Sequence, residues 1–130
     1  MFQHTVELEV RDYECDLQGI VNNANYLHYL EHARHQCLKA LGISFAKYHE
    51  EKKDLVVTEA QIKYHKSLLP GDKFLVKTIF ERRSKLRLAF VQNIYRTNSP
   101  GTEELVLSSE FIGVCIDQVL QKPVVLDLNF

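Results

Sequence analysis

The run from Ala24 to Leu41 constrains the fold more than any other part of the chain. Its apolar side chains recur three or four residues apart, which is the spacing of one face of an α-helix. The face consists of Tyr26, Leu30, Ala33, Cys37 and Leu41, and it is widened by Leu27, Tyr29, Leu38 and Ala40. So wide an apolar stripe predicts a helix that other structure largely surrounds. Asn22 or Asn23 suits its N-terminal cap, and Gly42 its C-terminal end.

The remaining regular pattern is an alternation of apolar and polar residues, which is typical of β-strands. Residues 3–11 show it first, before the helix. After a short, partly helical stretch at 43–53, strand-like runs follow at 54–66, 73–82, 86–97 and 104–117, with a weaker one at 123–128. Turn residues separate these runs at 70–72, 83–85 and 98–101.

This order of elements predicts an α+β fold in which one long helix packs on one antiparallel sheet. The strands are joined by short connections, which favour antiparallel neighbours. Residues 1–130 suit a single domain, without a repeat or linker. A single sheet around a single helix leaves edge strands exposed, and dimerisation commonly covers them.

Composition narrows the possible partners. The formal net charge of -1 gives no overall attraction to nucleic acid or to an anionic membrane. No apolar run is long enough to span a membrane, and the first residues lack the pattern of a signal peptide. The three cysteines, Cys15, Cys37 and Cys115, form no disulfide framework. We therefore expect reduced thiols and a cytoplasmic location.

The stretch from Arg11 to Arg34 carries the chemistry. It places a carboxylate, Asp16, seven residues before Asn23 at the expected helix start, with Gly19 between them to allow a sharp turn. A helix N-terminus presents unpaired N–H groups, which suit the oxyanion formed at a thioester carbonyl. A nearby carboxylate can attack that carbonyl or activate water. An aspartate before a helix also commonly serves as a cap or turn residue.

Two motifs give this chain a resemblance to a known family. The first reads Tyr13-x-x-Asp16-x-x-Gly19-Ile20-Val21-x-x-x-Asn25-Tyr26, followed by Glu31-x-Ala33-Arg34. The second reads Ile62-x-Tyr64-x-Lys66, then Pro70-Gly71-Asp72 and Val76-x-Thr78. Together they resemble the 4-hydroxybenzoyl-CoA thioesterase-like family, which includes the acyl-CoA thioesterases associated with the Tol–Pal system. The resemblance covers roughly residues 4–117.

The resemblance implies a hotdog fold, in which a five- to six-stranded antiparallel sheet wraps a long central helix. It implies hydrolysis of an acyl-CoA thioester without a cofactor, at sites on a homodimer interface and often within a homotetramer. By the same resemblance, Asp16 is the catalytic nucleophile or general base, and the backbone N–H of Asn23 points at the thioester carbonyl.

One position departs from the family pattern. Many Tol–Pal-associated members have a histidine where this chain has Asn23, and asparagine is no acid or base near neutral pH. The backbone N–H does not depend on that side chain. The Val21-Asn22-Asn23 segment is also similar to one in plant acyl-carrier-protein thioesterases, so an acyl-carrier-protein substrate stays open.

Basic residues are the candidates for binding coenzyme A, whose phosphates favour a basic rim. The densest run comprises Arg82, Arg83, Lys85 and Arg87, with Lys66 as a further candidate. Related hotdog enzymes use basic residues near this hairpin in that way. An ordinary charged turn is the alternative reading. The run has no interleaved aromatic residues, so nucleic acid is not indicated.

Other residue types near the motif have simpler explanations. Tyr13 either hydrogen-bonds in the site or packs. His28 and His32 with Glu31 match an inverted zinc-protease spelling, but nothing downstream supplies a third ligand, so we expect no metal. Glu31 suits an ion pair with Arg34 on the helix surface, and Cys15 a small buried side chain.

Two other activities compete with thioester hydrolysis. Hotdog hydratases have a histidine five residues after the aspartate, and here that residue is Val21. A non-catalytic module that binds acyl-CoA would be favoured by loss of the acid, but Asp16 is present. The sequence therefore predicts an acyl-CoA thioesterase.

Overall fold

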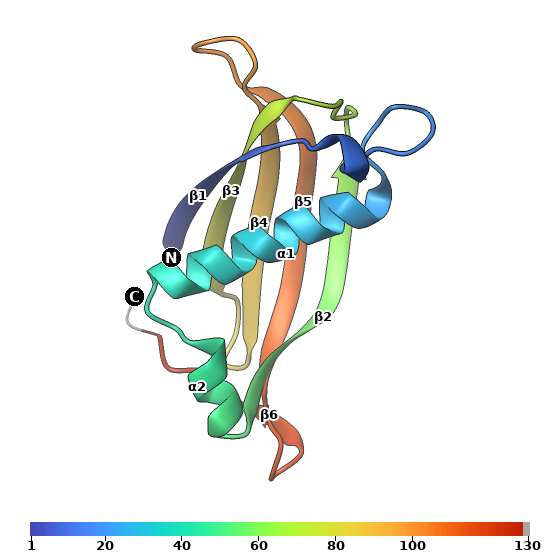
Figure 1. The fold of residues 1–130 in the computed structure, drawn as a ribbon. Helices are drawn as coiled ribbons and strands as arrows, with labels where there is room; N and C mark the ends of the chain where they lie inside the picture. Colours follow the sequence, from blue (N-terminus) through green and yellow to red (C-terminus); the bar gives the residue numbers. More distant parts are fainter. Residues whose placement is uncertain (129–130) are drawn as a thin grey trace.

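A long helix crosses the inner face of a curved antiparallel sheet in the computed structural model (Figure 1). The structure describes residues 1–128, so residues 129–130 of the expected 1–130 domain lie outside the described part. This arrangement confirms the predicted α+β class and the helix wrapped by a sheet.

The elements fall close to the predicted ranges. The strands are β1 (Phe2–Glu9), β2 (Lys53–Tyr64), β3 (Lys73–Arg82), β4 (Arg87–Arg96), β5 (Glu104–Asp117) and β6 (Lys122–Val124). The helices are the 3-10 turn η1 (Asp12–Glu14), the long α1 (Asn23–Ala40) and the short α2 (Phe45–Glu50). The weakly predicted strand at 123–128 is reduced to β6, which pairs with the end of β5.

The strand order in the sheet is β1-β3-β4-β5-β2, with every pair antiparallel. The expectation that short connections join neighbours holds for β3, β4 and β5 but is wrong for β2 and β3. Residues 65–72 cross the end of the sheet, so β2 pairs with β5 and lies at the far edge. β1 forms the other edge.

Both ends of α1 carry the expected signals. The Asn22 side chain accepts a 3.1 Å hydrogen bond from the Asn25 N–H and so caps the first turn. At the other end Gly42 adopts a φ of 90°, and its N–H donates to the Lys39 carbonyl.

The core lies between α1 and the inner face of the sheet. Leu30, Ala33 and Cys37 of the helix are fully buried, as are Val76 and Phe80 of β3. Alternate residues of β3 point inward because side chains alternate along a strand. This packing fixes α1 on the sheet, and it therefore also fixes where the helix begins.

Candidate active site

Asp16 lies in a tight loop that leads from η1 to the start of α1. Cys15 and Val21 pair as an isolated β-bridge and close the loop. Inside it the Asp16 N–H donates to the Ile20 carbonyl at 2.9 Å, and the Gly19 N–H donates to the Asp16 carbonyl at 3.0 Å. Gly19 has a φ of 77°, a conformation that favours glycine.

The Asp16 side chain is partly buried and half engaged. Its Oδ1 accepts a 2.9 Å hydrogen bond from the Gln18 N–H. Within residues 1–128, Oδ2 accepts none. One oxygen therefore fixes the carboxylate while the other is available to a substrate or a water molecule.

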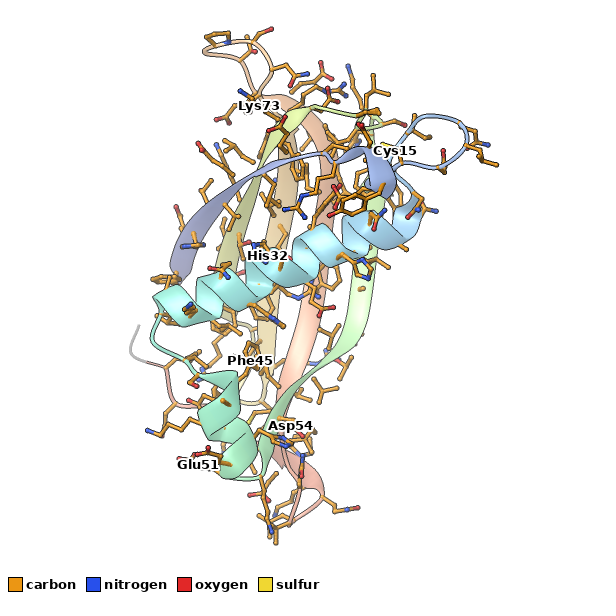
Figure 2. The ribbon with its side chains drawn as sticks, viewed as in Figure 1. Cys15, His32, Phe45, Glu51, Asp54 and Lys73 are labelled. Atoms are coloured by element: carbon orange, nitrogen blue, oxygen red, sulfur yellow. The ribbon has the colours of Figure 1, made fainter. Side chains whose placement is uncertain are left out.

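The first turn of α1 is held from two sides. The Asn25 side chain donates to the Glu14 carbonyl at 2.6 Å, and the Tyr26 hydroxyl accepts a 2.8 Å hydrogen bond from the Leu68 N–H. In the described part of the chain the N–H groups of Asn23 and Ala24 have no acceptor, as expected at a helix start. Figure 2 shows Cys15, the neighbour of Asp16, close to this first turn.

Two cationic side chains near this end of the sheet are paired with acids. Lys66 lies just beyond β2, and its Nζ is 3.6 Å from Glu104. Arg96 bridges Glu104 and the buried Asp72 at 3.3 and 3.2 Å. The structure therefore brings Asp16, Gly19, Asn23 and Lys66 to the same end of the sheet.

Within residues 1–128, neither the Tyr13 nor the Cys15 side chain hydrogen-bonds to the Asp16 carboxylate. The Tyr13 side chain is 75% exposed, and its hydroxyl accepts a hydrogen bond from Arg11. Burial raises the pKa of the Cys15 thiol, and the Asp12 and Asp16 carboxylates raise it further. Cys15 is thus held as a thiol, which makes it a poor nucleophile.

The basic run lies at the opposite end of the sheet from the Asp16 loop. Glu9, which leads to the Asp16 loop, pairs with Lys73 at the start of β3, whereas Arg82 ends that strand. Ten strand residues span about 33 Å. In one chain the structure therefore does not bring Arg82, Arg83, Lys85 and Arg87 together with Asp16.

Most of these basic side chains also have partners. Arg83 pairs with Glu81 and Glu110, and Arg87 lies 2.6 Å from Glu59. Arg82 donates to the carbonyls of Lys85 and Leu126. The Lys85 ammonium has no such partner within the described residues.

A cavity of about 770 Å³ lies between β1, η1 and α1, beside the Asp16 loop. Four carboxylates line it together with His28, Tyr29 and His32; they belong to Glu7, Glu9, Asp12 and Glu14. Burial raises the pKa of Tyr29, and the neighbouring Glu14 adds to the shift. In the part of the chain that the structure describes, no three His, Cys, Asp or Glu side chains gather to hold a metal ion.

The expected surface ion pair between Glu31 and Arg34 is wrong for residues 1–128. Arg34 turns inward, and its Nη1 donates a 3.0 Å hydrogen bond to the Gln92 side chain on β4. The sequence offered a weak signal, because Gln92 is a polar residue at an inward position of an otherwise apolar strand. The tertiary contact between α1 and β4 is what identifies Arg34 as the partner of Gln92.

Most of the chain matches a known protein family and individual known proteins. The family model described as thioesterase-like superfamily matches residues 10–127. The acyl-acyl carrier protein thioesterase ATL3, chloroplastic, of Arabidopsis thaliana is 37% identical over 114 residues, which are 88% of this chain and 58% of that protein. The putative acyl-CoA thioesterase YneP of Bacillus subtilis is 33% identical over 120 residues, 91% of this chain and 83% of that protein.

A solved structure shares the whole architecture. The DHNA-CoA thioesterase from Staphylococcus aureus superimposes with a TM-score of 0.85 at 30% identity, covering 98% of this chain and 83% of that one. The chain spans 58% of the length of the Arabidopsis relative. The family match covers most of the chain, and the fold is the hotdog fold that the motifs implied. This chain belongs to the thioesterase-like superfamily.

Proposed function

We propose that this protein hydrolyses an acyl-coenzyme A thioester to the free acid and the thiol. The observation that carries the proposal is the geometry of one loop. Asp16, with one carboxylate oxygen unengaged by residues 1–128, is tied through the Cys15–Val21 bridge to a helix start whose first N–H groups are unpaired.

The chemistry follows from these groups. The N–H of Asn23 donates to the thioester carbonyl oxygen and stabilises the negative charge that develops there. Asp16 either attacks the carbonyl carbon, giving an anhydride that water then opens, or takes a proton from a water that attacks directly. In both routes a C–O bond forms, the C–S bond breaks, and the departing sulfur receives a proton.

The quaternary structure that we propose is a homodimer paired along β2, alone or within a homotetramer. Among residues 1–128, β2 is hydrogen-bonded to another strand on one side only, and Val56, Val57 and Tyr64 on it are exposed. A long unpaired edge with exposed apolar side chains is a ready site for a second strand. Antiparallel pairing of two copies points their β3–β4 hairpins in opposite directions, so each basic hairpin reaches the end of the sheet that carries the partner's Asp16.

We favour coenzyme A over acyl-carrier protein as the thiol carrier. The acylated forms of both carriers contain the same kind of thioester bond. YneP, which is called a putative acyl-CoA thioesterase, is covered over most of its length. ATL3, called an acyl-acyl carrier protein thioesterase, supports the second candidate, although this chain spans a smaller share of it. Comparing kcat/KM for the same acyl group on the two carriers decides between them.

The decisive experiment measures thiol release from a panel of short, long and aromatic acyl-CoAs by the native chain and by Asp16→Asn. The asparagine oxygen retains the hydrogen bond from the Gln18 N–H, so the loop keeps its shape. We expect kcat to fall about 100- to 10,000-fold. Asp12→Asn, on the preceding turn, is the matched control and should leave kcat unchanged.

Each of three results would contradict the proposed hydrolysis or the role of Asp16 in it. Hydrolysis that survives Asp16→Asn removes the role of that residue. Hydration of an enoyl-CoA without hydrolysis identifies a hydratase. Tight binding of acyl-CoA without turnover identifies a binding module.

No helix among residues 1–128 is long and apolar enough to cross a membrane. The cytoplasmic location stays a prediction that imaging of a tagged chain tests.

A further inference from the structure

A second, smaller cavity lies between α1, α2 and the edge strand β2. Its volume is about 200 Å³. The apolar part of its wall is formed by Leu38, Phe45, Leu55, Val56, Val57 and Phe90. Phe45, labelled in Figure 2, is the first residue of α2 and lines the cavity from that helix. Such a wall suits a hydrocarbon, but the lining also includes the cationic side chain of Arg34.

The Arg34 guanidinium is held rigidly in this wall. Its Nη1 donates to the Gln92 Oε1 at 3.0 Å, and its central carbon lies 4.1 Å from the centre of the Phe111 ring. Gln92 is itself fully buried and donates to the Leu30 carbonyl and the Thr78 hydroxyl, both at 3.0 Å. A cation positioned by a buried network presents its remaining donors in one fixed direction.

Most of these donors have no protein partner. A guanidinium carries five N–H groups. Within the part of the chain that the structure describes, Gln92 is the sole hydrogen-bond acceptor for Arg34. Burial lowers the pKa of Arg34, which reflects the cost of holding its charge away from water, and Glu31 opposes that shift. None of these donors is among the buried unpartnered side-chain atoms of the described residues, so water reaches them, and an oxygen acceptor inside the cavity would take the place of that water.

We propose that this cavity takes the distal part of the acyl group and that Arg34 donates a hydrogen bond to a neutral oxygen on it, such as a hydroxyl or a ketone. The inference rests on the proposed function and names its substrate class. A carboxylate fits less well, because Glu31 lines the same cavity and places a negative charge beside Arg34.

Helix geometry places the oxygen far from the thioester. Arg34 lies three helical turns beyond Asn23 on the same helix, a rise of about 16 Å. The arginine side chain leans toward the helix N-terminus and covers part of that distance. The oxygen therefore belongs near the end of a medium-length acyl chain, not on the carbons beside the thioester.

The test compares three substrates of equal length: decanoyl-CoA, its ω-hydroxy derivative and its β-hydroxy derivative. For the native chain we expect kcat/KM to be at least about tenfold higher for the ω-hydroxy substrate than for decanoyl-CoA. The β-hydroxy derivative should gain nothing. Arg34→Met should remove the preference, so that kcat/KM becomes equal for the ω-hydroxy substrate and decanoyl-CoA.

Controls separate recognition from a purely structural role. Arg34→Lys keeps the charge but not the fork of donors, and it should show an intermediate preference. Lys39→Met removes an exposed charge from the same helix outside this cavity and should keep the full preference. Unfolding curves of each variant show that the fold is intact, and Arg34→Lys carries the test if Arg34→Met does not fold.

Binding of the free acids makes the inference testable without turnover. Calorimetry should show that the native chain binds ω-hydroxydecanoic acid more tightly than decanoic acid and that Arg34→Met does not discriminate. Equal kcat/KM and equal affinity for the two acids would overturn the inference, as would a gain confined to the β-hydroxy substrate. If the native chain hydrolyses none of the substrates but still binds ω-hydroxydecanoic acid more tightly than decanoic acid, only the proposed function is rejected.

Discussion

The Leu68 N–H donates a 2.8 Å hydrogen bond to the Tyr26 hydroxyl, and this bond joins the crossover between β2 and β3 to the first turn of α1. Both residues are buried. The neighbouring Val21 N–H donates to the Leu68 carbonyl at 3.0 Å, so Leu68 holds both the Asp16 loop and the helix start. The position of the candidate site therefore depends on a loop that contributes no candidate catalytic group.

Tyr26→Phe is expected to destabilise the protein by about 1–3 kcal/mol. The substitution keeps the ring but leaves the buried Leu68 N–H without an acceptor. Urea unfolding of the two proteins measures the difference. Tyr13→Phe is the control, because its hydroxyl is exposed and its loss should cost almost nothing. Equal free energies of unfolding for Tyr26→Phe and the native chain would contradict the prediction.

Gly19→Ala should reduce kcat more than its cost in stability explains. Alanine at a φ of 77° is strained by about 1 kcal/mol, and relief of that strain shifts the Asp16 loop. A small misplacement of a catalytic carboxylate can lower kcat by about tenfold or more. Gly101→Ala, at a φ of 76° in a distant turn, carries the same strain and should keep normal kcat. Equal kcat in the two variants would remove the link between this loop and catalysis.

Val57→Glu should shift the proposed dimer to a monomer, as measured by sedimentation velocity. Val57 lies on the unpaired edge strand and is 44% exposed, so its side chain is available to a second copy. A carboxylate there opposes pairing through like-charge repulsion and desolvation. Val125→Glu introduces the same charge at a residue that is 45% exposed away from β2, and it should leave the mass unchanged. An unaltered mass for Val57→Glu would place the interface elsewhere.

Stability should fall in alkaline solution, in part through Cys37. Burial raises the pKa of this thiol from 9.0 to about 11, so the folded state holds the proton more tightly than the unfolded chain does. The contribution is complete below pH 9 and is lost as the pH rises through about 11, which amounts to about 2–3 kcal/mol. Burial also raises the pKa of Tyr26, which adds a loss above pH 10.

Urea unfolding between pH 8 and pH 11 measures this loss. Cys37→Ala lowers stability at every pH because it leaves a cavity, but its stability should decline less steeply above pH 9. Parallel declines for Cys37→Ala and the native chain would exclude the thiol as the titrating group.

The local pattern of the sequence was sufficient for most elements. β3 occupies the predicted range 73–82, because a run of strand-forming residues there is bounded by turn residues on both sides. The start of α1 was predicted to within one residue, with Asn22 and Asn23 both offered as the cap, and the structure assigns the cap to Asn22. The fold class follows from the order of these elements, and the motif around Asp16 pointed to the family.

The sequence by itself determined which residues form the helix and strands and which carboxylate precedes the helix, because both depend on contacts between near neighbours in the chain. Tertiary structure alone decided that β2 pairs with β5, that Arg34 turns inward to Gln92, and that the basic hairpin lies at the opposite end of the sheet from Asp16. These relationships join residues far apart in sequence. Their energies depend on burial and on which partner is within reach, and no local pattern records either.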